Sequence, residues 1–180
     1  MVEGFKEGFD INCSLESLSQ TAKNHESIVE NSDIVQELLN IEIESGRIKG
    51  PFTEPPFPEY HVSPIKLVPK KTPGKYRMIL NLSYPYDGMS VNANIASEHC
   101  SVQYASIQDA ISKIQEVGPG CYMAKSDIES AFRIVPISAD CHKFLCFKFQ
   151  GKFYYDTCLA MGASCVIKYL RSYPQLCIGY

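Results

Sequence analysis

Residues 65–82 have the sequence IKLVPKKTPGKYRMILNL, and this stretch predicts a β-hairpin. Two runs rich in β-branched and aromatic residues, Ile65–Val68 and Tyr76–Leu82, flank a Pro73-Gly74 turn. The first half of the stretch and its turn are basic and contain no acidic residue, the cations being Lys66, Lys70, Lys71, Lys75 and Arg77. Solvated lysines are common at turns, but a basic hairpin tip is also compatible with a phosphate-bearing ligand.

A second hairpin is predicted in the C-terminal third of the chain. Two β-rich runs, 143–149 and 152–157, are separated by the turn signal Gln150-Gly151. The two hairpins together predict antiparallel strands.

Helical spacing of apolar residues is found in two segments. Residues 32–45 have Ser32 as a capping residue and Gly46 as a stop, and their apolar stripe consists of Ile34, Leu38 and Ile41. Residues 106–117 begin at the capping residue Ser106 and precede a Gly-Pro stop. Both segments are predicted helices.

The N-terminal part of the chain has weaker patterns. Residues 1–30 are polar and weakly periodic, which predicts a loosely ordered lead-in. Five prolines between positions 50 and 64 predict an extended linker. Because helices and strands do not alternate as βαβ units, the predicted fold class is α+β with a mixed or antiparallel sheet.

Charge is unevenly distributed along the 180 residues. The net charge is −3, with 4 basic and 10 acidic residues in positions 1–50 and 13 basic and 10 acidic residues in positions 51–180. No apolar run is long enough for a transmembrane helix, and the first twenty residues contain no signal-peptide block. We expect an intracellular protein without a membrane anchor, whose eight cysteines are reduced.

Two further segments contain residues suited to chemistry. Residues 125–136, KSDIESAFRIVP, follow a predicted strand, Cys121–Asp127, that ends in a carboxylate. A carboxylate at a strand end can bind Mg²⁺, although a solvated turn aspartate is the commoner explanation. Farther on, Gly162 lies between small residues and permits a close backbone approach.

The order and spacing of these segments resemble the reverse transcriptases. Residues 62–92 resemble the fingers, 125–136 resemble motif A, and 147–162 resemble the run into motif B. Additional Pro- and Phe-containing segments at 50–58, with SVQYAS at 101–106, are similar to the DIRS-like, tyrosine-recombinase retrotransposons. The resemblance implies a fold of fingers and partial palm, truncated before motif C.

The resemblance also implies roles for six residues. Asp127 corresponds to the motif A aspartate, the catalytic ligand of Mg²⁺, and Phe132 to the steric gate that selects deoxynucleotides. Four residues correspond to positions that hold the incoming dNTP or lie near the templating base: Lys70, Arg77, Met161 and Gly162. The implied partners are an RNA or DNA template-primer and dNTP.

The resemblance divides the chain into five parts. These are an acidic, partly helical lead-in (1–50), fingers with the basic hairpin (51–99), a partial palm with motif A (100–135), a return to the fingers with the start of motif B (136–165) and a divergent tail (166–180).

Two departures from the family pattern bear on activity. Ala160 replaces the proline that the family has before the motif B residue, and the sequence contains no Asp-Asp pair of the kind that motif C supplies. Because two-metal phosphoryl transfer needs several carboxylates, we expect this fragment of an RNA-directed DNA polymerase to be inactive alone.

Other functions are compatible with the same residues. The basic hairpin and the aromatic residues fit a non-enzymatic nucleic-acid or nucleotide binder, and an inert translated fragment is also consistent with the missing motif C. A helical protein-interaction module built on residues 32–45 is the alternative from an unrelated class.

Overall fold

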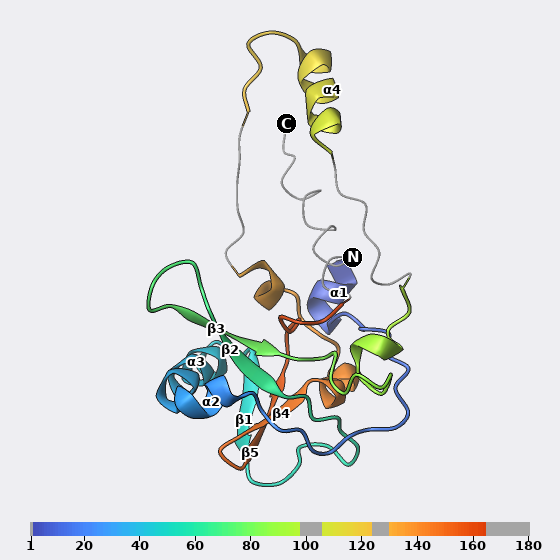
Figure 1. Cartoon of the computed structure of the whole chain (residues 1–180). Helices are drawn as coiled ribbons and strands as arrows, with labels where there is room; N and C mark the ends of the chain where they lie inside the picture. The colour runs from blue at the N-terminus through green and yellow to red at the C-terminus, as the bar shows by residue number, and fades with distance from the viewer. Residues whose placement is uncertain (1, 98–105, 124–129, 165–180) are drawn as a thin grey trace.

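The structure is a computed structural model that describes residues 2–97, 106–123 and 130–164. Two antiparallel sheets form its centre (Figure 1). The larger sheet has the strand order β1 (Ile48–Phe52), β5 (Lys152–Asp156), β4 (Cys146–Phe149), and the smaller one pairs β2 (Ile65–Pro69) with β3 (Tyr76–Leu80). Antiparallel sheets combined with helices confirm the predicted α+β class.

The hairpin of β4 and β5 follows from its turn residues. Gln150 and Gly151 both have positive φ, 48° and 74°, as a two-residue hairpin turn of the primed type requires. The first strand begins at Cys146 rather than at Lys143, where the sequence predicts it, because Ala139–Phe144 form the 3₁₀ helix η4.

The predicted basic hairpin is also present. β2 and β3 pair without a register shift from Ile65↔Leu80 to Pro69↔Tyr76. At the tip, the Lys70 N–H donates a hydrogen bond of 2.7 Å to the Lys75 carbonyl oxygen. The backbone therefore holds the basic turn closed.

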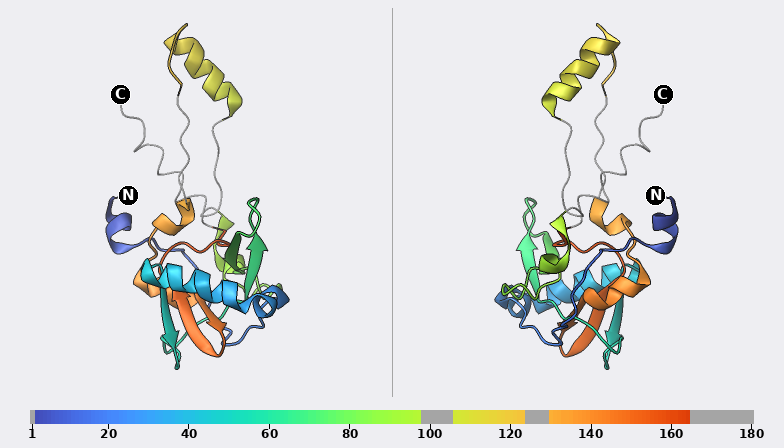
Figure 2. Two further views of the ribbon diagram at one scale, coloured as in Figure 1. Left: turned by 90° about the vertical axis from the view of Figure 1, so that its left-hand side faces the viewer. Right: turned by 90° about the vertical axis from the view of Figure 1, so that its right-hand side faces the viewer.

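α3 (Ser32–Glu44) is the longest helix, and it contacts β1 and β3. It runs across the strands of the larger sheet (Figure 2). Its fully buried residues are Val35 and Leu39, whereas Ile41 is 47% exposed. The predicted helix is correct, but the buried stripe is rotated by about one position from the predicted one.

The N-terminal segment is part of the core, so the predicted loose lead-in over residues 1–30 is wrong. The segment contains α1 (Val2–Glu7) and α2 (Glu26–Glu30), and it buries Ile11, Leu15 and Ile28. These residues belong to one apolar cluster with the hairpin and the larger sheet. Scattered apolar residues in a polar segment carry no periodicity, which is why the sequence pattern missed them.

The sequence patterns also did not predict β1, the first strand of the chain. β1 includes Pro51 and pairs antiparallel with β5, with Ile48 opposite Asp156. It therefore crosses the boundary drawn at residue 50, and the proline-rich linker begins inside a sheet. The irregular register between Lys49 and Phe52 accommodates the proline, as expected for a residue that lacks an N–H donor.

The helix predicted at 106–117 is α4 (Ile107–Val117), and Ser106 and Asp109 form its capping box. None of its side chains is buried, and Ile107 is 82% exposed. The helix lies apart from the two sheets (Figures 1 and 2).

The strand predicted over Cys121–Asp127 is not found in its described part. Residues 121–123 lie in no strand, and residues 124–127 are outside the described ranges. After the undescribed residues, Ala131–Ile134 form the 3₁₀ helix η3. Among the described helices, none is long and apolar enough to cross a membrane.

We predict that Val35→Ala lowers the free energy of unfolding by about 2 kcal/mol, because it removes two buried methyl groups and leaves a cavity. Val29→Ala is the matched control, since Val29 in α2 is 78% exposed, and it should change stability by less than about 0.5 kcal/mol. Urea unfolding measures both variants, and equal effects would contradict the placement of α3.

We also predict that acidification destabilises the fold through His61, which is fully buried. Burial lowers the pKa of His61, and its Nδ1 accepts a hydrogen bond from the Ser19 N–H. The unfolded chain therefore binds more protons below about pH 6.5, and stability falls from there toward the lowered folded pKa.

Urea unfolding at pH 7.5 and 5.5 measures this fall, and His61→Asn should reduce it. The fall should not vanish, because burial also lowers the pKa of His142. A variant with the wild-type pH dependence would show that His61 is not the titrating group.

Candidate nucleotide-binding site

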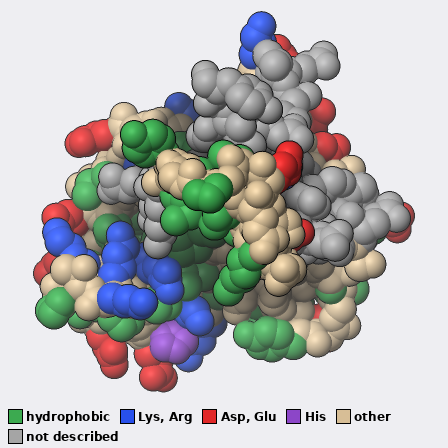
Figure 3. All heavy atoms as spheres, turned by 90° about the horizontal axis from the view of Figure 1, so that it is seen from above, with side chains coloured by type: hydrophobic (Ala, Val, Ile, Leu, Met, Phe, Trp, Pro, Cys, Tyr) green, Lys and Arg blue, Asp and Glu red, His purple; other side chains and the backbone are tan. Residues whose placement is uncertain are grey.

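A cavity of about 120 Å³ opens between the basic hairpin and the rest of the described chain. Its walls come from α3, β1, β3, the basic turn, the segment around η3, the end of β5 and Met161. Lys and Arg side chains gather on this face of the molecule beside hydrophobic ones (Figure 3). We call this cavity between the hairpin and the rest of the described chain the central cavity.

Three of the predicted site residues meet at the central cavity. Lys70 and Arg77 line it from the basic hairpin, and Met161 lines it from the segment after β5. Lys70 and Arg77 are exposed, and neither forms an ion pair with an acidic residue of the described chain. The hairpin thus supplies two cations to the cavity, and Met161, more than 80 positions later in the chain, supplies an apolar side chain.

Gly162, next to Met161, lets the backbone lie close against β3. Its φ is 130°, and a Cβ atom at this position would collide with the carbonyl oxygen of Leu80 in β3. Asn92 holds the same segment, because its Nδ2 donates to the Gly162 carbonyl oxygen at 2.8 Å and its Oδ1 accepts from the Ser164 N–H at 2.9 Å. The predicted close backbone approach at Gly162 is confirmed.

Of the other two predicted site residues, one cannot be placed and the other does not line the cavity. Asp127 lies outside the described residues. Phe132 is half-buried, packs against the main apolar cluster and is not among the residues that line the cavity. From the same segment, Ser130 and Arg133 line the cavity instead.

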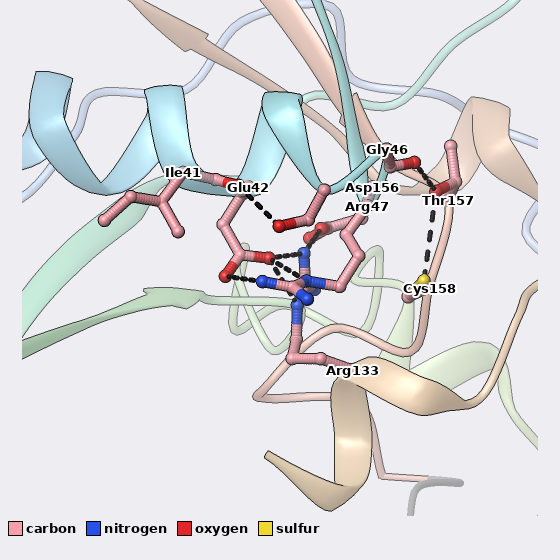
Figure 4. Close-up of polar contacts among 9 residues, drawn as sticks. Ile41, Glu42, Gly46, Arg47, Arg133, Asp156, Thr157 and Cys158 are labelled. Atoms are coloured by element: carbon pink, nitrogen blue, oxygen red, sulfur yellow. Dashed lines mark hydrogen bonds and ion pairs between the residues drawn. The ribbon is translucent and has the colours of Figure 1, made fainter. Parts of the chain in front are cut away.

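Beside the cavity lie four charged residues that the sequence patterns did not predict as a cluster. We call them the ion cluster: Glu42, Arg47, Arg133 and Asp156 (Figure 4). Arg47 binds both carboxylate oxygens of Glu42, at 2.8 and 3.0 Å. Arg133 donates from Nε and Nη2 to Glu42 Oε2 at 3.0 and 2.8 Å, and its Nη2 lies 2.6 Å from Asp156 Oδ1. Three of the four, all except Arg47, line the cavity.

The electrostatics of the ion cluster follow from its burial. Burial opposes the charge of Arg133, but the carboxylates of Asp156 and Glu42 outweigh this and raise its pKa. Burial also opposes ionisation of Glu42, yet the two arginines lower its pKa. Burial raises the pKa of Asp156, against the opposing effect of Arg133. Arg133 is therefore permanently charged and needs both carboxylates as partners.

The sequence signals of the ion cluster were a charged residue within one apolar run and another at the end of a β-rich run. Arg133 interrupts AFRIVPI, and Asp156 ends the β-rich run of β5. Their partnership joins positions 23 residues apart, and Glu42 lies 91 residues before Arg133, so no local pattern connects them.

The carboxylates beside the cavity do not fit a metal ion, because arginines occupy both. Within the described ranges, no group of three or more His, Cys, Asp or Glu residues could hold one.

These features define a reverse-transcriptase-like fold, as comparison with solved structures shows. A foamy viral protease-reverse transcriptase in complex with double-stranded DNA matches 91% of this chain with a TM-score of 0.63 and 16% identity. The native protease-reverse transcriptase of prototype foamy virus matches 89% of this chain with a TM-score of 0.60 and 18% identity. The foamy viral protein in complex with an RNA/DNA hybrid matches 93%, with a TM-score of 0.59 and 15% identity.

The chain spans only part of these proteins. The matches cover 26%, 19% and 20% of the three foamy viral chains, respectively. No family model and no curated protein matches the sequence. The similarity therefore establishes the fold.

We predict that Gly162→Ala lowers the free energy of unfolding by about 3 kcal/mol, because it combines backbone strain with a collision at Leu80. Gly74→Ala is the matched control, since Gly74 also has positive φ (73°) but no atom within 4 Å of the new Cβ. It should cost only the strain, about 1 kcal/mol. Equal losses in urea unfolding would contradict the close contact with β3.

Proposed function

We propose that this chain is the nucleotide-binding part of an RNA-directed DNA polymerase, a reverse transcriptase, of a DIRS-like retrotransposon. The observation that carries the proposal is the meeting of Lys70, Arg77 and Met161 at one cavity within a reverse-transcriptase-like fold. The Pro- and Phe-containing segments at 50–58 and the SVQYAS segment at 101–106 support the retrotransposon type.

The basic hairpin suits the triphosphate of a dNTP. Lys70 and Arg77 are exposed cations on a turn whose backbone is closed by the Lys70–Lys75 hydrogen bond. Charge-assisted hydrogen bonds from such groups are the strong contacts that phosphate oxygens accept. Met161 and Gly162 would then lie near the base of the nucleotide and its templating partner.

Asp127 and Phe132 complete the proposed site. Phe132, in η3, would crowd a ribose 2′-hydroxyl and select deoxynucleotides. Asp127 would bind Mg²⁺, which neutralises phosphate charge in phosphoryl transfer. Because the sequence has no Asp-Asp pair, we expect no primer extension by these 180 residues alone, and the proposed activity belongs to a longer polymerase or a partner that supplies motif C.

The division into fingers (51–99 and 136–165) and partial palm (100–135) is part of the proposal.

An RNA or DNA template-primer is the proposed partner, and the foamy viral neighbours include complexes with DNA and with an RNA/DNA hybrid. A second cavity, of about 210 Å³, supports nucleic-acid binding. Its lining combines the basic side chains of Lys23, His25 and Lys66 with the aromatic rings of Tyr84 and Tyr86. Such a protein would work inside the cell, where dNTPs are found.

We predict that the chain binds a fluorescent dATP analogue and that Lys70→Ala and Arg77→Ala each weaken this binding by about tenfold, as expected for loss of one charged hydrogen bond. Lys71→Ala is the matched control, since it removes the same charge from the same turn but Lys71 does not line the cavity. It should change the Kd by less than about twofold. Fluorescence anisotropy titration measures all four proteins.

Two results would separate the proposal from its alternatives. Binding of primed template without any dATP affinity would favour a non-enzymatic nucleic-acid binder. If the chain bound neither primed template nor dATP, even at low salt, an inert fragment would be favoured. Primer extension by the 180 residues, lost in Asp127→Ala, would show that the chain is more complete than we propose.

A further inference from the structure

The ion cluster contains an arginine, Arg133, that borders the central cavity and is paired with carboxylates of the protein. The Arg133 side chain is 13% exposed, and those of its partners Glu42 and Asp156 are 23% and 5% exposed. Nε and Nη2 are both engaged by these carboxylates at 2.6 to 3.0 Å. Turning Arg133 toward a phosphate would leave Asp156 buried without a counter-charge, which is a costly state.

The two cations across the cavity are in the opposite situation. Lys70 and Arg77 are exposed, and no acidic residue of the described chain pairs with them. They can bind an anion without breaking an ion pair between described residues. The cavity therefore separates ligand-binding cations on the hairpin from a structural cation on the opposite wall.

Arg133 belongs to η3, whose Phe132 also packs against the main apolar cluster. η3 has only four residues and follows Ser130, whose φ is 53°. Ser130 itself lines the cavity and is exposed. The ion pairs of Arg133 connect this wall to the last turn of α3 and to the end of β5 (Figure 4).

We propose that Arg133 is a positioning residue of the nucleotide site: it fixes the η3 wall against α3 and β5 and leaves phosphate binding to Lys70 and Arg77. This inference rests on the proposed nucleotide-binding function. The guanidinium is suited to this task because its planar fork contacts two carboxylates at once, which a lysine ammonium cannot do in the same geometry.

The test compares two ligands of the wild-type chain, the fluorescent dATP analogue and inorganic tripolyphosphate as its competitor. Arg133→Lys keeps the charge beside Asp156 but loses the fork, and it should weaken dATP binding about fivefold while tripolyphosphate binding changes by less than about twofold. Lys70→Ala should weaken both, because it removes a phosphate ligand.

Two further variants control for stability. Val35→Ala lowers stability in α3 without touching the cavity, and it should leave both affinities unchanged. The double variant Arg133→Gln/Asp156→Asn removes both buried charges together, so it avoids an unpaired carboxylate and decides the question if Arg133→Lys does not fold. It should also lose dATP affinity selectively.

If the Arg133 variants weakened the binding of dATP and of tripolyphosphate equally, Arg133 would itself contact the phosphates, and the inference would be overturned. Unchanged dATP binding in the folded variants would overturn it as well, while the proposed function would stand. Failure of the wild-type chain to bind dATP would overturn the proposed function and this inference with it.

Discussion

The packing of four charged side chains, Glu42, Arg47, Arg133 and Asp156, is the constraint on which the described site depends. Two positive and two negative groups are neutral as a set, but each would be costly to bury alone. They come from the last turn of α3, the connection to β1, the helix η3 and the end of β5. Four separate parts of the chain must therefore reach their places together, and the cavity wall is fixed by the same requirement.

The opposite wall is fixed by backbone contacts rather than by charge. Gly162 lies directly against Leu80 of β3, and Asn92 holds the turn segment on both sides of Ala163. These contacts place Met161 beside the basic hairpin without using Lys70 or Arg77. No carboxylate in the described part of the chain pairs with the two cations, and an unpaired cation is suited to binding a phosphate ligand.

Sequence patterns predicted the features whose causes are local. Gln150-Gly151 and Pro73-Gly74 specified the two hairpins, and Ser106 with Asp109 specified the start of α4. The N-terminal core residues, such as Ile11, were missed because they are isolated apolar residues whose burial depends on distant partners. The ion cluster was missed for the same reason, since Glu42 and Arg133 are paired only in the folded chain. Lys70, Arg77 and Met161 could be proposed from motif order, but only the fold brings them to one cavity.

The ion cluster also limits where metal chemistry could occur. Asp156 is the most deeply buried carboxylate beside the cavity, and by position alone it would be a candidate ligand for a divalent cation. Arg133 at 2.6 Å excludes this, because a cation at Asp156 would have to displace a guanidinium that also holds Glu42. The charges at this end of β5 are thus already balanced within the protein. Within the described residues, this end of the cavity is therefore built to hold its own charges in place, while the cations of the hairpin face it from the other side.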